Sequence, residues 1–402
     1  MKPKYLGILV VLVLAVIVSC EWSESVDPPP PRDTLLSVPS EYSTIQHAID
    51  AAREGDIVEV ADGVYEGVGN TNLTFGGKLI TLRSKNGASA TKIDCKGSSL
   101  SPRRAFVFNG DEDSNLVIEG LTISRGYPSG AGTDQGARGG GVYVETSSPR
   151  FVNCAFSGNS AEYGGAVFCR TASPIFENCT FSQNTAEDGA AFNCDGNAKP
   201  KIRNCTFSDN YATVRGGAIY CLTASPVITG TTFGNNRASS LGGAVYCGQS
   251  SPSLSDCILY RNNASAEGGA IYATINSNPT ITNCTMVSNS AVIGGGLSCS
   301  NDSEPRLTYS LIAFSQGGGA VRSADDINFP SLSCCNIYSN SGGDWVGDSI
   351  AAQANQKGNI SLNPLLCDPS AGDVRLKEGS PCFPDNNSCQ QQIGALVGIC
   401  PE

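Results

Sequence analysis

One set of aromatic residues recurs at nearly constant spacing through the middle of the chain. Its members are Tyr143, Phe168, Tyr220, Tyr246 and Tyr272, and each follows a small-residue segment such as Gly-Gly-Ala. If each residue belongs to a separate winding of the chain, the rings stack in one outward-facing column, the aromatic stripe. Flat rings bind sugars or partner side chains because they offer a large apolar area with little entropy to lose. The stripe is therefore the predicted ligand-binding site. The alternative is that the rings only stabilise neighbouring strands.

Catalytic pairs are harder to find in the sequence. A glycosidase needs two carboxyl groups flanking one bond, and a solenoid must supply them from neighbouring windings. The densest acidic groups, Asp111-Glu112-Asp113 and Asp325-Asp326, lie in irregular loops and are expected to be solvated turns. Arg215 and Lys201 are candidate bases, but no acidic column is expected to face them. His47, the single histidine, is expected on the surface of a lid helix. We therefore predict no catalytic residue.

The charge and composition of the chain argue against several partners. The formal net charge is −11, and it becomes −13 once Lys2 and Lys4 are removed with residues 1–19. An acidic chain without basic clusters is a poor ligand for nucleic acid, and it repels anionic polymers unless cations bridge them. With one histidine and dispersed cysteines, a zinc site is not expected. No metal and no cofactor are predicted.

Eighteen cysteines are present, and most of them fall into two columns. One column contains Cys154, Cys179, Cys205, Cys257, Cys284 and Cys335, and the other contains Cys169, Cys194, Cys221, Cys247 and Cys299. Both columns should face inward. Because export to an oxidising space favours disulfides, one hypothesis pairs the columns with each other. The proposed bridges are Cys154–Cys169, Cys179–Cys194, Cys205–Cys221, Cys284–Cys299 and Cys247–Cys257. The alternative is buried free thiols that pack like small apolar residues.

A repeat of about 26 residues determines the predicted fold. Prolines recur at steps of 25 to 27 residues, at Pro149, Pro174, Pro200, Pro226, Pro252, Pro279, Pro305 and Pro330. Apolar residues lie two and seven positions after each proline, as at Phe176 and Phe181, and a bend residue such as Asn178 separates them. Such regularity is typical of a solenoid. Three short strands per repeat predict an all-β protein, a single-stranded right-handed parallel β-helix of about 10 coils, roughly 50 Å long.

Both ends of this rod need a cover, because a bare end coil exposes strand edges. Residues 43–54 predict a capping helix. Ser43 and Gln46 form a capping box, Ile45, Ala48, Ile49 and Ala52 share the buried face, and Gly55 ends the helix. We expect the β-helix with this cap to span residues 38–358. Residues 359–402 contain four cysteines and predict a compact, crosslinked closing segment.

The N-terminus predicts export. Lys2 and Lys4 precede an apolar run at residues 6–18, which is too short to span a membrane but fits a secretory signal. Ile17-Val18-Ser19-Cys20 resembles the lipobox of bacterial lipoproteins, which implies a signal peptide at residues 1–19 and lipidation of Cys20. Residues 20–37 are proline-rich and predict a semi-extended tether. The expected location is the bacterial cell envelope, in the outer membrane or at the cell surface.

Two further resemblances concern the repeat. Gly164-Gly165-Ala166-Val167 followed by Phe181-Ser182-Gln183-Asn184 resembles the repeats of chlamydial polymorphic outer membrane proteins. The entry segment at residues 38–58 resembles the start of pectin-lyase-like β-helix proteins. This fold hosts lyases, hydrolases, esterases and adhesins, so it does not determine function.

Together these features predict a surface-anchored, non-catalytic lipoprotein that binds a glycan or a partner protein. The alternative function is a polysaccharide lyase or hydrolase that acts on uronate-type polymers. A purely structural spacer is a third hypothesis, and the sequence makes no prediction about oligomeric state.

Overall fold

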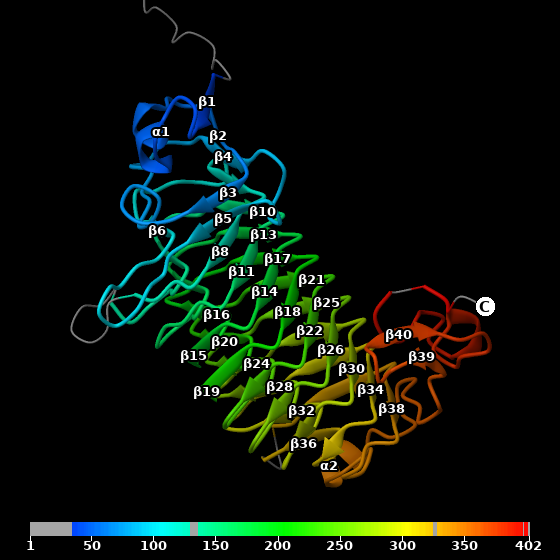
Figure 1. Cartoon of the computed structure of the whole chain (residues 1–402). Coiled ribbons are helices and arrows are strands. Elements are labelled where there is room, and N and C mark those ends of the chain that lie inside the picture. Colours follow the sequence, from blue (N-terminus) through cyan, green and yellow to red (C-terminus); the bar gives the residue numbers. More distant parts are fainter. Residues whose placement is uncertain (1–33, 129–135, 325–327, 397, 401–402) are drawn as a thin grey trace, which may run out of the picture.

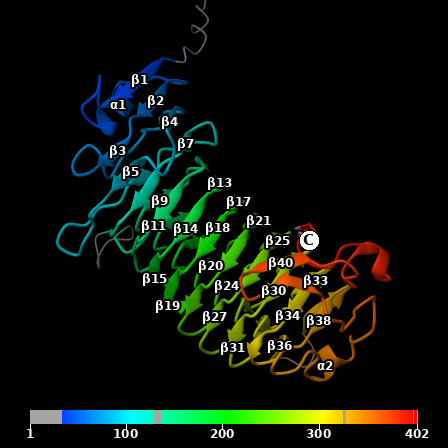
Figure 2. The ribbon, with the colours of Figure 1, turned by 45° about the vertical axis from the view of Figure 1, so that its right-hand side comes forward.

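The structure is a computed structural model that describes residues 34–128, 136–324, 328–396 and 398–400. Within this part the chain winds into stacked coils, and successive coils extend the same long sheets (Figure 1, Figure 2). Strands of neighbouring coils pair in parallel, whereas β39 (Leu366–Asp368) and β40 (Asp373–Leu376) form a separate antiparallel pair. The molecule is a parallel β-helix of about eleven turns, in agreement with the predicted fold class.

Two sheets, A and B, run along almost the whole rod, and a bend of a few residues joins them in each coil. Sheet A consists of β1 (Leu35–Val38), β2 (Ile57–Val60), β4 (Thr81–Ser84), β7 (Val117–Glu119), β10 (Arg150–Val152), β13 (Ile175–Glu177), β17 (Lys201–Arg203), β21 (Val227–Thr229), β25 (Ser253–Ser255), β29 (Thr280–Thr282), β33 (Arg306–Thr308) and β37 (Ser331–Ser333). Sheet B consists of β3 (Gly63–Tyr65), β5 (Thr91–Asp94), β8 (Thr122–Ser124), β11 (Ala155–Ser157), β14 (Thr180–Ser182), β18 (Thr206–Ser208), β22 (Thr232–Gly234), β26 (Ile258–Tyr260), β30 (Thr285–Val287), β34 (Leu311–Ala313) and β38 (Asn336–Tyr338).

Two shorter sheets, C and D, complete the coil. Sheet C consists of β15 (Thr185–Asp188), β19 (Tyr211–Arg215), β23 (Arg237–Ala238), β27 (Asn263–Ala264), β31 (Ser290–Ala291) and β35 (Gln316–Gly317). Sheet D consists of β6 (Phe106–Phe108), β9 (Val142–Glu145), β12 (Val167–Arg170), β16 (Phe192–Asp195), β20 (Ile219–Leu222), β24 (Val245–Gly248), β28 (Ile271–Thr274), β32 (Leu297–Cys299) and β36 (Val321–Ser323). The repeat predicts three strands per coil, but six coils contain a fourth. Small residues such as Ala186 and Ala212 are buried there, which lets the backbone approach the next coil.

The core consists of side chains that repeat in vertical columns. The Phe181 and Phe207 rings stack with centroids 4.5 Å apart and planes 4° apart, as direct neighbours in adjacent coils. Phe176 and Phe181 are fully buried on sheets A and B. Between them Asn178 has φ 53°, so the predicted bend column has a left-handed backbone. Both apolar columns and the bend between them are therefore confirmed.

A second asparagine column forms a buried ladder beside sheet B. Asn184 and Asn210 are buried, and Nδ2 of Asn184 donates to Oδ1 of Asn210 at 3.0 Å and to the carbonyl oxygen of Phe156 at 3.0 Å. Oδ1 of Asn210 also accepts from the backbone N–H of Asn184 at 3.1 Å. Each rung therefore satisfies polar groups that a tight bend would otherwise leave without partners in the interior.

The predicted N-terminal cap is present as α1 (Ile45–Ala51), whose Ile45, Ala48 and Ile49 face the core. The predicted capping box is wrong by one residue, because Thr44 is the N-cap and its hydroxyl accepts from the N–H of His47 at 3.3 Å. The amide of Gln46 binds Thr74 instead, which ties the helix to the next coil. The helix ends at Ala51, before the predicted stop at Gly55.

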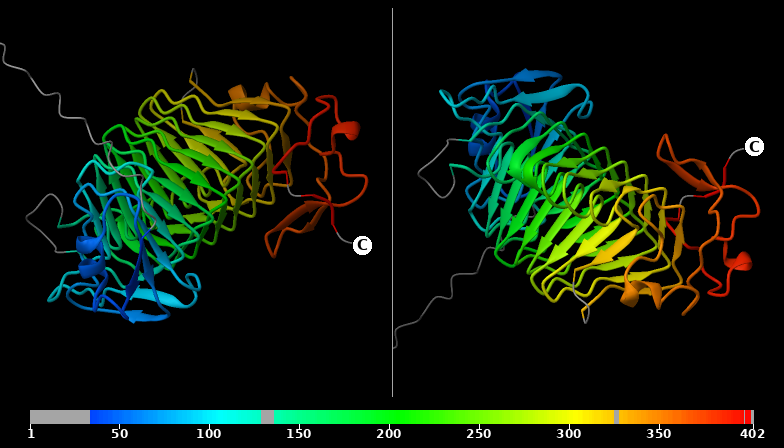
Figure 3. Two further views of the ribbon diagram at one scale, coloured as in Figure 1. Left: turned by 90° about the horizontal axis from the view of Figure 1, so that it is seen from above. Right: turned by 90° about the horizontal axis from the view of Figure 1, so that it is seen from below.

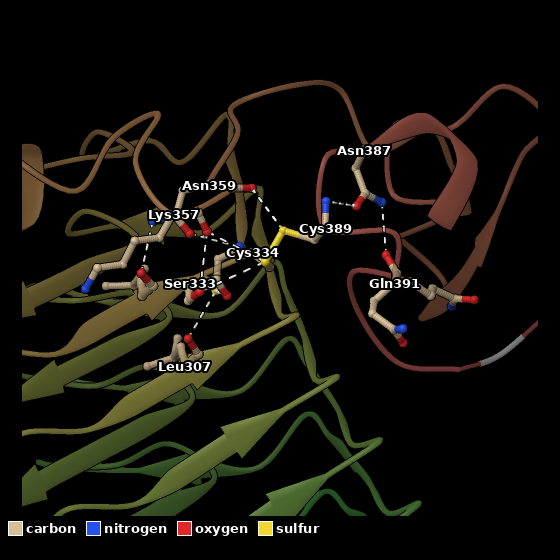
Figure 4. Close-up of a disulfide and its surroundings, with 12 residues drawn as sticks. Leu307, Ser333, Cys334, Lys357, Asn359, Asn387, Cys389 and Gln391 are labelled. Carbon is tan, nitrogen blue, oxygen red and sulfur yellow. Dashed lines mark hydrogen bonds between the residues drawn. A yellow bond between two sulfur atoms is a disulfide. The ribbon is translucent and has the colours of Figure 1, made fainter.

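The C-terminal segment lies along the side of the rod (Figure 3). The end of the rod is covered by Trp345 and by α2 (Asp348–Ala351), whose Ile350 is buried. Residues 360–396 and 398–400, hereafter the strap, include the short helix η1 (Pro384–Asn386) and fold back over the outer face of sheet B. Two disulfides crosslink this region, Cys334–Cys389, which Figure 4 shows, and Cys367–Cys400. The predicted crosslinked segment therefore covers a side of the solenoid.

The hypothesis that the two cysteine columns pair with each other is wrong. The eleven cysteines of the two columns, with Cys95 and Cys382, are buried and are not joined by disulfides. Where a column continues into the next coil, its cysteines are neighbours of one another. Sγ of Cys205 lies 3.4 Å from the backbone nitrogen of Cys179, and Cys169 and Cys194 are in-register strand partners. Burial raises the pKa of the Cys335 thiol to about 12, so this thiol is protonated and unreactive at neutral pH.

Several predictions concern the N-terminus, outside the described residues. These are the signal peptide at residues 1–19, Cys20 and most of the 20–37 tether. Strand β1 begins at Leu35, inside the predicted tether. In the part of the chain that the structure describes, neither α1 nor α2 is long or apolar enough to cross a membrane.

Candidate functional site

The aromatic stripe lies on sheet D as two stacks of rings, because Asn193 separates Phe168 from Tyr220. The Tyr143 and Phe168 rings stack at 5.7 Å, Tyr220 and Tyr246 at 4.9 Å, and Tyr246 and Tyr272 at 5.7 Å. However, these five residues are only 1 to 7% exposed. The ring faces touch one another and not solvent, so the stripe as it stands cannot offer flat faces to a sugar.

Charged side chains cover the stripe. The guanidinium of Arg215 lies 4.9 Å from the Tyr220 ring centroid, and Asp188 binds it with two hydrogen bonds of 2.9 and 2.6 Å. Arg138 lies 4.9 Å above Phe168. Burial under this layer raises the pKa of Tyr220. Because cation–π contacts and ion pairs add to the ring stacking, the layer stabilises sheet D. The sequence missed this arrangement, since it predicts no acidic partner for Arg215.

The other residues considered for catalysis are dispersed. Glu112 was expected in a solvated turn, but it is 2% exposed and accepts from the Ser147 hydroxyl at 2.6 Å and the Gly77 N–H at 3.1 Å. It therefore anchors neighbouring coils. His47 is exposed on α1, and Lys201 is exposed on sheet A, far along the chain from the lid. Asp325-Asp326 lie outside the described residues.

A surface hollow at the bend between sheets A and B brings together acidic and basic groups. This corner pocket has a volume of about 350 Å³. Its lining residues are Glu59, Arg83, Ser84, Lys85, Gly87, Ala88, Glu119, Gly120 and Asn153. Glu59, Arg83 and Glu119 are direct partners on three adjacent strands, β2, β4 and β7. All three point outward, because Val58, Leu82 and Ile118 of the same strands are buried.

The hollow exists because one bend is longer than the others. Six residues, 85–90, separate β4 from β5, whereas two separate the next pair, β7 and β8. Ser84 fixes this loop, since its hydroxyl accepts from the Gly87 N–H at 2.9 Å and bonds Thr91 at 2.7 Å. The Asn86 side chain adds two hydrogen bonds of 3.0 Å to Asp62. The wall of the pocket is therefore held in place before any ligand arrives.

The two carboxylates of the pocket have different surroundings. Glu59 accepts two hydrogen bonds from Arg83, of 3.2 and 2.9 Å. The side chain of Glu119 makes no hydrogen bond or ion pair with any residue that the structure describes. Two strand spacings separate Glu59 from Glu119, so their Cα atoms lie roughly 10 Å apart. Two carboxyl groups with different environments on either side of a hollow can divide acid and base roles.

The sequence did not predict this site, for an identifiable reason. The 26-residue repeat begins near Pro149, and the first coils have irregular lengths, so their strand positions cannot be aligned by counting. The available signal was Glu59 and Glu119, each next to a buried aliphatic residue, in Val58-Glu59-Val60 and Ile118-Glu119-Gly120.

A second hollow of about 340 Å³ lies beside sheet C and contains Glu162 and Glu187. Its lining includes Pro128 and Gly136, which flank in sequence the undescribed residues 129–135. Across the described ranges, no group of three or more histidine, cysteine or acidic side chains could hold a metal ion. Of the two hollows, the corner pocket alone combines carboxylates with basic side chains, which makes it the stronger candidate.

The structure is thus a parallel β-helix with a corner pocket, at the bend between sheets A and B, that contains both acidic and basic side chains. The family model described as "Right handed beta helix region" matches residues 67–236 and 190–359. These spans together cover more than half of the chain, so the chain belongs to the right-handed β-helix family. No curated protein matches the chain.

Two solved structures illustrate the likeness of fold. The catalytic domain of a family GH87 α-1,3-glucanase in complex with nigerose has 13% identity, covers 79% of this chain and 70% of its own, and gives a TM-score of 0.45. A mannuronic-acid-specific polysaccharide family 6 lyase from human gut microbiota has 11% identity, covers 77% and 81%, and also gives 0.45. At this level the likeness concerns the fold alone. The resemblance to chlamydial repeats stays a prediction.

Proposed function

We propose that this β-helix binds a polysaccharide in the corner pocket and cleaves it, with Glu59 and Glu119 as the carboxyl pair. One observation carries the proposal: two outward carboxylates lie on either side of Arg83 in a hollow of about 350 Å³. The sequence predicts polysaccharide cleavage as the alternative function. We now favour it over non-catalytic binding, because the aromatic stripe is buried and this pocket is open.

The two glutamates have separate roles in this proposal. Arg83 donates two hydrogen bonds to Glu59 and holds the carboxylate in place, which suits a base that takes a proton from water. Glu119, without a side-chain partner among the described residues, carries the proton that passes to the leaving glycosidic oxygen. Water then adds to the anomeric carbon. Inverting glycosidases place their carboxyl groups roughly 6.5–9.5 Å apart to admit this water, and the roughly 10 Å between the Cα atoms is compatible with that range.

Substitution of each glutamate tests the proposal. Purified protein is incubated with a panel of neutral and uronate polysaccharides, and new reducing ends and the ultraviolet absorbance of unsaturated uronates are followed. We expect E119Q and E59Q to lower the rate by about 10²–10⁴-fold. E66Q is the matched control, since Glu66 also pairs with a basic side chain, Lys96, and lies outside both the pocket and sheet A. Full activity in E119Q would overturn the assignment.

The panel also separates cleavage from recognition. Unsaturated products would identify elimination instead of hydrolysis, with Lys85 and Arg83 as the basic groups at hand. Binding without any cleavage would support non-catalytic glycan recognition instead. In that case Y220A/Y246A tests the aromatic stripe, because loss of binding without loss of folding would locate the ligand on sheet D.

We also propose that the protein is exported and anchored in the cell envelope by lipid on Cys20. The apolar run at residues 6–18 and the lipobox-like Ile17-Val18-Ser19-Cys20 support this. One acyl chain holds weakly and two or more hold firmly, so full modification gives stable attachment. In a bacterial host, the wild-type chain should partition with membranes and take up labelled fatty acid. C20A should do neither, and labelled C20A would refute the site.

A further inference from the structure

The outer face of sheet A differs in charge from the rest of the molecule. Its strands point eight charged side chains outward, namely Glu59, Arg83, Glu119, Arg150, Glu177, Lys201, Arg203 and Arg306. Five are basic and three acidic, a net charge of +2 in a chain with a net charge of −11. Residues that border the strands of sheet A add two basic groups, Lys85 and Lys199, and three acidic groups, Asp62, Asp256 and Glu304. The wider face therefore has a net charge of +1. Sheet A is thus a positive strip on an acidic protein.

The charges along this strip are arranged in two ways. Near the pocket the basic groups are paired, since Arg83 binds Glu59 at 2.9 Å, and Glu177 binds Arg150 at 2.5 Å and Arg203 at 3.2 Å. Lys201, on the same strand as Arg203, and Arg306, farther along the rod, are exposed and have no side-chain partner among the described residues. Four strand steps, roughly 19 Å, separate them. Two free positive charges at this spacing fit a polymer better than a small ligand.

Hydroxyl groups fill the strip between and beyond these two charges. Apart from Val227, the outward residues are Thr229, Ser253, Ser255, Thr280, Thr282, Thr308, Ser331 and Ser333. Neighbours touch across coils, because the hydroxyls of Thr229 and Ser255 lie 3.2 Å apart and those of Thr282 and Thr308 lie 3.1 Å apart. The strap covers the outer face of sheet B, not this one. A polar ligand can therefore lie along sheet A with a hydrogen-bonding group at every coil.

We propose that the outer face of sheet A is a docking track for a linear, carboxylate-bearing polysaccharide that extends from the corner pocket along the rod. This inference rests on the proposed cleavage and names its substrate class. The pocket residues Glu59, Arg83 and Glu119 belong to the same outward column as Thr229 and Thr308, so track and pocket are continuous. The arginines of this face already bind carboxylates, and a guanidinium fork matches that group in geometry. An acidic protein can hold an anionic polymer here because its negative charge lies elsewhere.

The experiment measures binding separately from cleavage. The full chain carrying E119Q is titrated with polygalacturonate and with its methyl ester, which has the same backbone without the charge, and dextran sulfate serves as a second anion. K201Q/R306Q removes the two free charges and leaves the ion pairs intact. R261Q/K377Q is the matched control, because Arg261 and Lys377 are exposed on other faces. Gln183 occupies the bend position equivalent to Arg261, so glutamine fits there.

We expect K201Q/R306Q to weaken polygalacturonate binding about tenfold and to reduce its salt dependence, since screening acts on exposed charges. The R261Q/K377Q control should bind polygalacturonate as the parent E119Q chain does. The methyl ester should bind weakly to the parent and to the control. Unchanged affinity in K201Q/R306Q would overturn the track, and equal binding of the ester or tighter binding of dextran sulfate would overturn the carboxylate class. If the track holds but E119Q still cleaves, the pocket assignment fails and the docking face stands.

Discussion

At the scale of single residues, the buried asparagine ladder shows how strictly the interior fixes side-chain chemistry. Asn210 uses both amide hydrogens and its oxygen, donating to Phe181 and Asn236 and accepting from Asn184. Aspartate has the same shape but no N–H to donate. The ladder therefore needs asparagine itself, whereas the bend column between sheets A and B accepts Asn204, Gly230 or Asp256.

This difference gives the first prediction. We expect N210D to lower the free energy of unfolding by about 2–4 kcal/mol, because two buried acceptors lose their donors and a charge is buried. N204D should change it by less than about 0.5 kcal/mol, as for most exposed substitutions. Urea unfolding followed by circular dichroism measures both. Equal stability of the two variants would mean that the ladder does not require an amide.

The second residue-scale prediction concerns Asp256. Its Oδ1 is buried without a hydrogen-bond partner among the described residues, and burial raises the pKa of the carboxyl group. The folded state therefore binds this proton more tightly than the unfolded chain does. The associated stability is fully present below the unfolded pKa and is lost as pH rises through the folded pKa.

Asparagine at this position removes the buried charge. D256N should therefore be more stable than the parent protein at pH 7, and the difference should vanish as the pH falls below the ordinary aspartate pKa. D209N, at an exposed bend, is the control. Thermal melts from pH 3 to pH 7 test this, and a gain that is equal at both ends of the range would contradict the desolvation argument.

At the scale of elements, the repeat predicts whatever recurs every 26 residues and nothing else. The Phe181 column, the Asn178 bend and the buried face of α1 follow from spacing and side-chain type. The burial of Tyr220 does not, because the side chain that covers it, Arg215, comes from the residues before each glycine pair, where types vary between coils. The corner pocket lies in the irregular first coils. The fold was therefore readable from the sequence, and the charged groups at the surface were not.

The strap shows how an irregular element is fixed to a regular one. Its Leu366, Val374 and Ile393 pack on Val287, Leu311 and Ala313, where the outward positions of sheet B change from hydroxyl to apolar. Cys334, in the bend between β37 and β38, forms a disulfide with Cys389, which lies 55 residues later in the sequence (Figure 4). Most contacts between coils do not involve the strap, so we expect the strap and the rod to unfold separately.

Removing that crosslink is the third prediction. C334A/C389A should lower the stability of the strap by about 2–4 kcal/mol, since the open loop regains chain entropy. Hydrogen exchange should then increase in residues 360–400 and at Leu311, while the coil around Phe181 stays protected. C367A/C400A, at the other disulfide, is the comparison. Equal loss of protection along the whole rod would show that strap and solenoid unfold as one unit.

At the scale of the whole molecule, each coil contacts only its neighbours, so the ends of the rod are its weak points. An uncovered coil presents strand edges and core side chains to other molecules. The helix α1 prevents this at the first coil, where Ile45 and Ile49 are at most 1% exposed. Loss of this cap should therefore change how molecules associate more than it changes the fold of the distant coils.

I49D tests this last prediction, because a charge on the buried face of α1 separates the cap from the core. We expect a loss of about 2–5 kcal/mol, confined to the first coils, together with concentration-dependent association measured by light scattering. H47D adds the same charge to the exposed face of the same helix and should remain as dispersed as the parent. Circular dichroism verifies that the β-structure persists. If I49D stays dispersed with its first coils opened, covering the end of the rod is not what keeps the molecules apart.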